Sequence, residues 1–277
     1  MRFLVVLGLS LLTLALPASA QVKAEKPPHL APHRAVYDLS LASSRGARAI
    51  ESARGRIALD FTGDACEGYA LKFRQVTVME SAESGTKTSD LRTANFESGD
   101  GKTFRFRNDT GSGEGPAQSV DGNAEKKASA LAVRLKAPKR DNVSLDAEAV
   151  FPNTQMKDLI AAANAGKSTL SMKIFDGSDD GRTVYETLSV IGKRIEPGQV
   201  EGLEEAARQE GLAKLARWPV TMSYFKPGKR DETPVYVLGF DLYENGVSRA
   251  LRLDYGDFAL KGEMTRLELL PEKPCQR

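Results

Sequence analysis

The stretch Tyr236-Val-Leu-Gly-Phe-Asp-Leu-Tyr-Glu-Asn-Gly-Val-Ser-Arg-Ala-Leu-Arg-Leu-Asp-Tyr255 carries the clearest β-pattern in the chain. Asn245-Gly246 lies between two runs of alternating apolar residues, and this dipeptide favours a two-residue type I′ turn. With Glu244 opposite Val247, the register places Leu238 opposite Leu253 and gives both strands one apolar face. The sequence therefore predicts a β-hairpin with this register.

A third strand is predicted directly after the hairpin. Gly256-Asp257 indicates a turn into a strand over residues 258–270, in which Gly262 indicates a bulge. Pro271 and Pro274 then stop the sheet, because proline cannot donate a hydrogen bond to a neighbouring strand. The stretch 233–275 is therefore expected to close the protein with a β-meander, and Cys275 lies in the tail just past it.

Short runs with strand character recur through the rest of the chain, separated by turn residues. They cover residues 33–41, 53–61, 69–78, 91–96, 103–107, 130–135, 145–150, 169–175, 182–195 and 218–225. This pattern predicts an all-β, mainly antiparallel domain.

One amphipathic helix interrupts the predicted strands. Met156, Leu159, Ile160 and Ala163 fall at i, i+3, i+4 and i+7, residues 153 or 154 are suitable N-caps, and Gly166 fits the C′ position. Such a helix gains most of its stability by burying its apolar stripe. We expect it to lie in the hollow of a curved sheet, where these four side chains either border a ligand groove or belong to a packed core.

The segment 196–217 is harder to interpret. Leu203, Ala207 and Leu215 are compatible with a helix, whereas Gly202 and Gly211 weaken that interpretation. The sequence indicates a charged excursion with some helical character.

The N-terminus has the features of a secretory signal. Arg2 precedes an apolar core over residues 3–16, and Ala18-Ser19-Ala20 matches a small-residue cleavage site. We interpret residues 1–20 as a signal peptide, 21–32 as a flexible leader and 33–277 as a single domain. This organisation predicts a periplasmic protein with no transmembrane segment after signal cleavage, because no later apolar run approaches the roughly 20 residues of a membrane span.

Charge and cysteine content agree with that compartment. The formal net charge of the whole chain is +2, which implies neither a nucleic-acid partner nor a strongly anionic surface. The chain has two cysteines, Cys66 and Cys275. In an oxidising compartment such a pair is expected to form a disulfide, here one that closes a long loop.

Residues suited to catalysis or metal binding are sparse. His29 and His33 are the two histidines, and both precede the first predicted strand or begin it. They are therefore interpreted as histidines of the surface or the leader, where a catalytic partner is out of reach. The segment Asp176-Gly-Ser-Asp-Asp-Gly181 imitates the start of a calcium loop, but position twelve is Thr187 where a bidentate glutamate is expected. It is therefore interpreted as a solvated hairpin loop. The sequence predicts no catalytic residues, no metal and no cofactor.

Several stretches together resemble a known family. These are His33-Arg-Ala-Val-Tyr-Asp-Leu-Ser-Leu41, Leu91-Arg-Thr-Ala-Asn-Phe96, Asp176 to Gly181 followed by Val184-Tyr185, Trp218-Pro-Val-Thr-Met-Ser-Tyr-Phe225, and Tyr243-Glu-Asn-Gly246 before a terminal cysteine. They resemble the EipB family (DUF1849), periplasmic cell-envelope integrity proteins of Alphaproteobacteria. The resemblance covers nearly all of the chain that follows the predicted signal.

The resemblance implies a β-spiral, a long antiparallel sheet coiled around a helix and similar in shape to the lipoprotein carriers LolA and LolB. It also implies a disulfide that maps onto Cys66 and Cys275. The expected function is a non-enzymatic factor that supports envelope integrity, with an envelope protein, lipid, lipoprotein or peptide as its partner. The alternatives are a structural scaffold with a filled core and a hydrolase that uses carboxylates.

Overall fold

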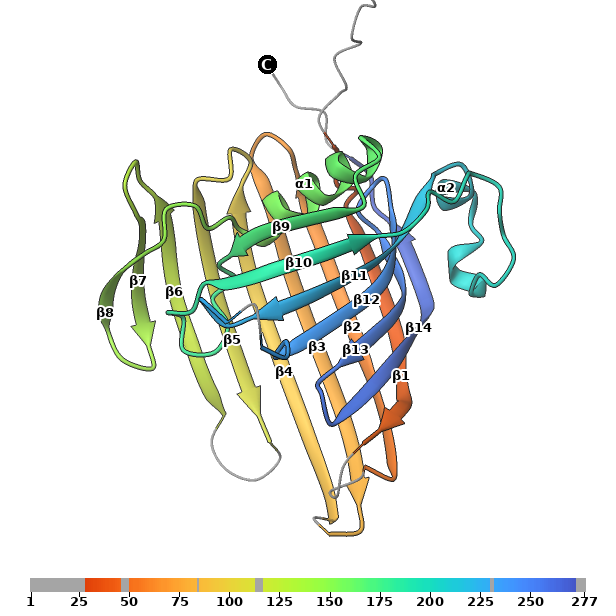
Figure 1. Cartoon of the computed structure of the whole chain (residues 1–277), viewed down its shortest axis with the longest axis horizontal. Helices are drawn as coiled ribbons and strands as arrows, with labels where there is room; N and C mark the ends of the chain where they lie inside the picture. The colour runs from red at the N-terminus through yellow and green to blue at the C-terminus, as the bar shows by residue number, and fades with distance from the viewer. Residues whose placement is uncertain (1–27, 46–49, 84, 113–116, 230–231, 273–277) are drawn as a thin grey trace, which may run out of the picture.

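The computed structural model describes residues 28–272, except for 46–49, 84, 113–116 and 230–231. Within these residues the backbone forms one antiparallel sheet and one long helix (Figure 1). The predicted all-β, mainly antiparallel class is confirmed.

The sheet has 14 strands among the described residues. They are β1 (His33–Ser44), β2 (Ser52–Asp64), β3 (Gly68–Ser81), β4 (Gly85–Ser98), β5 (Thr103–Gly111), β6 (Gln118–Lys126), β7 (Leu131–Ala137), β8 (Asp141–Leu145), β9 (Thr169–Ile174), β10 (Tyr185–Ile191), β11 (Arg217–Phe225), β12 (Tyr236–Tyr243), β13 (Ser248–Asp254) and β14 (Phe258–Leu269). The helix α1 (Pro152–Asn164) separates β8 from β9, and two short elements, η1 (Glu205–Ala207) and α2 (Glu210–Ala213), separate β10 from β11.

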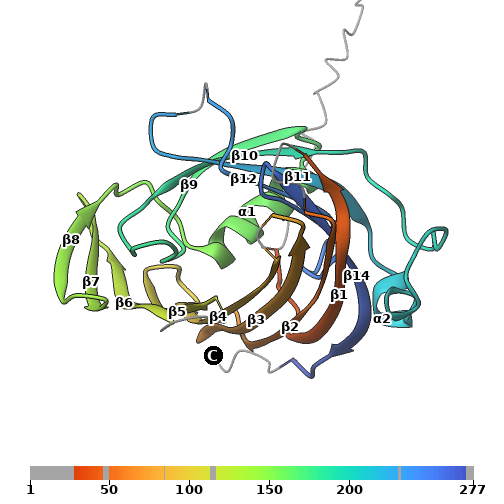
Figure 2. The same ribbon diagram turned by 90° about the horizontal axis from the view of Figure 1, so that it is seen from below.

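Two meanders make up this sheet. Strands β1 to β8 follow one another in space, as do β9 to β14, and the pairing of β1 with β14 joins the two series. The sheet coils so that β9 to β12 cross in front of the long strands β2 to β5 (Figure 1). Seen from below, α1 lies inside the coil (Figure 2). The structure is therefore a β-spiral around a helix, as the sequence predicted.

The hairpin between β12 and β13 corrects the predicted turn. Tyr243 N–H donates to the Val247 carbonyl at 2.9 Å, and Gly246 N–H donates to the Tyr243 carbonyl at 2.9 Å. Gly246 has φ 85°, so the loop is a three-residue turn with a glycine bulge, and the expected two-residue type I′ turn is wrong. Ala250, with φ 50°, is an extra residue in β13 that restores the predicted register.

Leu238 therefore lies opposite Leu253, as predicted. The predicted bulge at Gly262 is wrong, because Gly262 pairs regularly with Leu39 and Leu251. The extra residue in β14 is Thr265, since Val36 faces Arg266 and Tyr37 faces Met264. These bulges bend the strands, and a coiled sheet requires such bends.

Strand β6 was not predicted, because its inward positions lack large apolar side chains. Val120, Gly122 and Ala124 face the core, and a Cβ on Gly122 would lie 2.7 Å from the Phe106 ring. The glycine therefore leaves room for an aromatic ring of the neighbouring strand. This close packing removes the alternating pattern by which a strand is recognised in sequence.

The C-terminal end of helix α1 is as predicted, whereas its N-cap residue differs from the prediction. Gly166 adopts φ 71°, and Gly166 and Lys167 donate to the carbonyls of Ala163 and Ala162, both at 3.0 Å. This Schellman arrangement confirms Gly166 at C′. At the other end, Phe151 is the N-cap and Pro152 the first helical residue, so neither residue 153 nor residue 154 caps the helix.

Residues that precede β1 pack against the sheet without belonging to a strand. Leu30 and Ala31 are buried, Ala31 N–H donates to the Asn245 carbonyl at 2.8 Å, and Leu270 N–H donates to the Pro32 carbonyl at 2.8 Å. These residues fall in the range that the sequence predicted as a flexible leader. Residues 30–32 are therefore held against the β12–β13 turn and β14.

The segment 196–217 is held against the sheet by a buried ionic network. The Arg249 guanidinium donates from Nε to the Glu204 carboxylate, from Nη1 to the Asp241 carboxylate, and from Nη2 to the Gly202 carbonyl at 2.9 Å. Leu203 and Leu212 are buried in the same apolar cluster as residues of β1, β13 and β14. The sequence showed the charges of this segment but not their burial.

Candidate ligand-binding hollow

The helix fills much of the space inside the coil. Leu159, Ile160 and Ala163 are almost fully buried and pack with Trp218 and residues of β11 and β12. Three of the four side chains expected to border a groove thus belong to the core. Met156 is half-buried and lines a cavity.

This cavity, which we call the helix-end cavity, lies at the first turn of α1. Its volume is about 210 Å³, and it is lined by Leu30, Ala31, His33, Tyr37, Leu59, Phe61, Leu71, Pro152, Asn153, Met156, Asn245, Gly246 and Ser248. The lining is mainly apolar and comes from β1 to β3, α1 and the β12–β13 turn. It is the part of the hollow that matches the predicted position of a ligand site.

His33 stands in the wall of the helix-end cavity. It is 6% exposed, its Nδ1–H donates to the Ala31 carbonyl at 2.8 Å, and its ring lies 5.7 Å from that of Phe61. The expectation of a surface histidine is therefore wrong for His33. Burial lowers the pKa of its imidazole, because a charged ring loses hydration there, so the neutral form is favoured.

Glu97 positions the helix at this end of the hollow. Its carboxylate, on β4, accepts hydrogen bonds from the backbone N–H of Asn153 at 2.7 Å, from that of Thr154 at 2.9 Å and from the Thr154 hydroxyl at 2.5 Å. It thereby satisfies N–H groups of the first turn that have no partner within the helix. Burial raises the pKa of the Glu97 carboxyl, and the hydrogen bonds oppose that rise.

A larger cavity lies between the long strands and the second meander, and we call it the tyrosine slot. Its volume is about 580 Å³, within the range of about 300–1,000 Å³ typical of ligand pockets. It is lined by Phe73, Gln75, Leu91, Asp176, Ser178, Asp179, Tyr185, Tyr224, Lys226, Val235, Tyr236 and Tyr255. Four of the seven tyrosines of the chain thus share one cavity.

The aromatic wall of the slot is a row of rings on β10, β11 and β12 and on the turn that follows β13. Ring centroids are 6.2 Å apart for Tyr185 and Tyr224, 5.8 Å for Tyr224 and Tyr236, and 5.1 Å for Tyr236 and Tyr255. Tyr224 and Tyr236 are directly opposite one another in the pairing of β11 with β12. Cross-strand register therefore builds the row, and no single sequence segment contains it.

The loop 176–181 closes one end of the tyrosine slot. The Asn108 side chain donates to the Gly177 carbonyl at 2.8 Å and accepts from the Thr93 hydroxyl at 2.7 Å. A Cβ on Gly177 would lie 2.3 Å from the Phe106 ring. The loop joins β9 to β10 as predicted, and Asp179 and Asp180 are exposed as expected of a solvated loop. Gly177 and Gly181 are buried against β5 to β7, so the loop is solvated only in part.

Two carboxylates of this loop line the slot. Asp179 accepts a hydrogen bond from the Tyr185 hydroxyl, and the Asp176 carboxylate accepts from Ser178 N–H at 2.9 Å. Burial raises the pKa of the Asp176 carboxyl. Across the described residues, no group of three or more His, Cys, Asp or Glu side chains is arranged to hold a metal ion.

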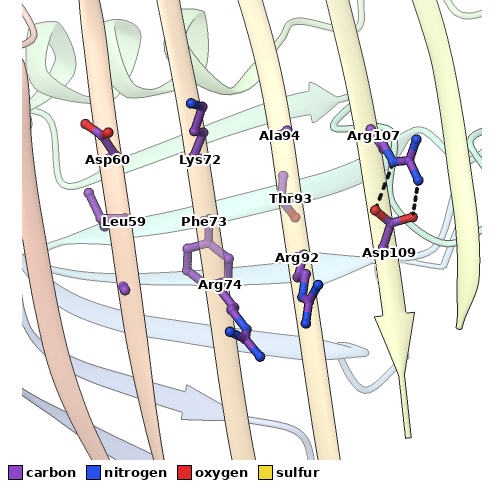
Figure 3. A pocket seen from close by; sticks show the side chains of 11 residues that line it. Leu59, Asp60, Lys72, Phe73, Arg74, Arg92, Thr93, Ala94, Arg107 and Asp109 are labelled. Carbon is purple, nitrogen blue, oxygen red and sulfur yellow. Dashed lines mark hydrogen bonds and ion pairs between the residues drawn. The ribbon is translucent and has the colours of Figure 1, made fainter.

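A third cavity lies over the outer face of β2 to β5. It has a volume of about 400 Å³ and lies among charged side chains that include Lys72, Arg74, Arg92 and Arg107 (Figure 3). Arg107 bonds to Asp109 at 2.9 Å, and Arg74 and Arg92 both bond to Asp90, which lowers the pKa of the Asp90 carboxyl to about 2. These arginines already have partners, which is typical of a solvated surface rather than of an anion site.

Two other sequence predictions concern membrane helices and cysteines. Among the described residues, no helix is long and apolar enough to cross a membrane. Cys66 follows β2 in a turn where the Asp64 carboxylate accepts its backbone N–H at 2.9 Å. Cys275 and the predicted signal peptide lie outside the described residues, so the disulfide and the signal stay predictions.

The coiled sheet, the enclosed helix and the two cavities inside the coil define a β-spiral protein. A family model described as EipB-like matches residues 24–271. The chain belongs to this EipB-like family.

One protein sequence and one crystal structure from Brucella abortus illustrate the relationship. The chain is 36% identical, over 241 residues, to the cell envelope integrity protein EipB of strain 2308, covering 87% of this chain and 84% of that protein. It also superposes on the crystal structure of a β-barrel-like protein of the domain of unknown function DUF1849, with a TM-score of 0.80 and 34% identity. That match covers 88% of this chain and 100% of the other.

Proposed function

We propose that this protein is a non-enzymatic periplasmic factor that supports cell-envelope integrity by holding the acyl chain of a lipid or lipoprotein in the helix-end cavity. The name of the Brucella relative supports the envelope role. The observation that carries the binding proposal is the apolar space beside Met156, which the core side chains of α1 leave open.

The size of the helix-end cavity suits part of a ligand. At about 210 Å³ it is smaller than the roughly 300 Å³ at which ligand pockets usually begin. It therefore fits the end of an acyl chain rather than a whole lipid. Each methylene transferred from water into such a site contributes about 0.8 kcal/mol.

Titration of delipidated protein with a fluorescent fatty acid, followed by displacement with a diacylglycerol lipid and an acylated peptide, tests this function. Met156→Glu places a charge in the cavity and is expected to weaken probe binding more than tenfold, because the carboxylate loses hydration against a mainly apolar lining when an acyl chain enters. Asn164→Glu introduces the same residue at the exposed end of the same helix and serves as the matched control.

Absence of probe binding to the wild type, or equal binding by the two variants, would contradict acyl binding at this cavity. In that case the protein would be a structural scaffold. Leu159, Ile160 and Ala163 fill the coil with core packing, which is what a structural scaffold requires.

A further inference from the structure

The tyrosine slot is separate in its lining from the helix-end cavity. The two cavities share no lining residue. One is mainly apolar, whereas the other combines aromatic rings with two carboxylates, an amide and an amine. A different ligand chemistry is therefore expected for the tyrosine slot.

The slot is built from rigid parts. Its aromatic wall rests on β10 to β12 and on the turn after β13, and its opposite wall is Phe73, Gln75 and Leu91 on the long strands β3 and β4. The Gln75 amide donates to the Tyr255 hydroxyl at 3.2 Å across the slot. At the closed end, Asn108 and Phe106 fix the loop that carries Asp176 and Asp179. Polar groups are therefore held in place before a ligand arrives.

The chemistry of the walls points to a ligand with apolar faces and many hydroxyl groups. Tyrosine rings offer flat apolar surfaces with a polar tip, on which the C–H faces of a sugar ring can stack. Tyrosine hydroxyls both donate and accept, the glutamine amide does the same, and ionised carboxylates accept only. A sugar ring carries hydroxyl donors and acceptors around its rim and matches this set.

Two other ligand classes fit less well. Asp176 and Asp179 outnumber the single cationic lining residue, Lys226, so the slot disfavours phosphates and other anionic headgroups. A proline-rich peptide also docks on aromatic grooves, but its prolines lack N–H groups and offer nothing to carboxylate acceptors. The two carboxylates therefore favour a glycan over a proline-rich peptide.

We propose that the tyrosine slot is a carbohydrate-binding site that takes a short uncharged oligosaccharide. Sugar rings stack on Tyr224, Tyr236 and Tyr255, and their hydroxyls bond to the carboxylates of the loop 176–181 and to Gln75. An exported protein meets such sugars in the glycan strands of the cell wall, which are built of N-acetylhexosamines, and in neutral hexose chains.

Calorimetric titration of the wild type with chitotetraose, maltotetraose and cellotetraose tests the proposal and distinguishes the two sugar sources. Binding of at least one tetrasaccharide with a Kd below about 1 mM is expected. Asp179→Asn keeps the side-chain size and tolerates the φ of 53° at this position, and it should weaken binding at least tenfold by removing a charged acceptor. Tyr255→Ala, at a residue that is 38% exposed, should have a similar effect without unfolding the protein.

Tyr243→Phe is the matched control, because Tyr243 is a buried tyrosine outside the slot, and its sugar affinity should equal that of the wild type. Failure of all three tetrasaccharides to bind, or unchanged affinity in both slot variants, would overturn the proposal. Binding of a proline-rich decapeptide in place of the sugars would also overturn it. The fluorescent fatty acid should bind the slot variants like the wild type, which separates this site from the helix-end cavity.

Discussion

The Glu97 carboxylate of β4 accepts a hydrogen bond from the backbone N–H of Thr154 at 2.9 Å. This bond fixes the first turn of α1 to the long strands of the sheet. The two residues are 57 positions apart in the sequence. In most helices the N-cap side chain accepts this hydrogen bond, but here the N-cap is Phe151, whose side chain has no acceptor. The placement of the helix, and with it the helix-end cavity, therefore depends on a glutamate of the sheet.

Replacement of Glu97 by alanine should lower the free energy of unfolding by about 1–3 kcal/mol, because it leaves buried N–H groups without an acceptor. Glu97→Gln retains one acceptor oxygen and should cost less. Urea denaturation measures both effects. Glu125→Ala, at an exposed glutamate of β6, is the control, and a Glu97→Ala variant as stable as this control would contradict the capping role.

Replacement of Arg249 by alanine should lower the free energy of unfolding by about 3–5 kcal/mol, since it leaves the buried carboxylate of Glu204 without its arginine partner. Asp241 loses the same partner and keeps Arg217 at 3.6 Å. Hydrogen exchange of residues 199–207 should accelerate as the segment detaches from the sheet. Arg252→Ala, on the same strand but exposed, should change stability by less than about 0.5 kcal/mol. Equal losses in the two variants would show that the network does not hold the segment.

The buried imidazole of His33 should make stability pH-dependent. Its pKa is lowered in the folded state, so between that value and the ordinary value of about 6.5 the unfolded chain binds a proton that the folded protein does not. The stability that the neutral His33 ring allows is fully present above about pH 6.5, and it is lost as the pH falls through the folded-state pKa. Thermal unfolding at pH 5 to 8 should show a steeper loss for the wild type than for His33→Gln. If the melting temperatures of the wild type and of His33→Gln change with pH in the same way, the pH dependence of stability arises from other groups.

We expect Cys66 and Cys275 to form an intramolecular disulfide when the protein is exported. Alkylation before and after reduction, followed by intact mass measurement, should find no free thiol in the unreduced protein and two after reduction. The bridge would close a loop of roughly 209 residues, and removing it by Cys66→Ser should cost at most about 5 kcal/mol. Two thiols that react without reduction would disprove the pairing.

Part of the fold could be predicted from local sequence pattern. The strands flanking Asn245-Gly246 carry a two-residue alternation, which gave the Leu238–Leu253 register even though the turn itself was predicted incorrectly. The 3.6-residue stripe from Met156 to Ala163 and the glycine at position 166 predicted the helix and its end. Periodicity is a local property, so it survives without knowledge of the tertiary structure.

The candidate sites were less accessible to prediction. Met156 was expected beside a cavity and lines one, whereas Leu159, Ile160 and Ala163 proved to be core. The tyrosine slot was missed because its rings come from four separate positions in the chain, and each looks like an ordinary strand residue. Spacing along one strand carries no information about which residue of the next strand lies opposite.

The sequence by itself therefore determined the antiparallel class, the long helix and the family, because these follow from alternation, caps and residue runs that are local. Tertiary structure decided which polar groups are buried and what they face. Glu97 caps a distant helix, Asn108 fixes the loop that carries Asp176, and Ala250 restores the strand register. Each of these outcomes requires two segments to meet in the coiled sheet, and the bulges and long-range pairings that coil it act only when the whole chain has folded.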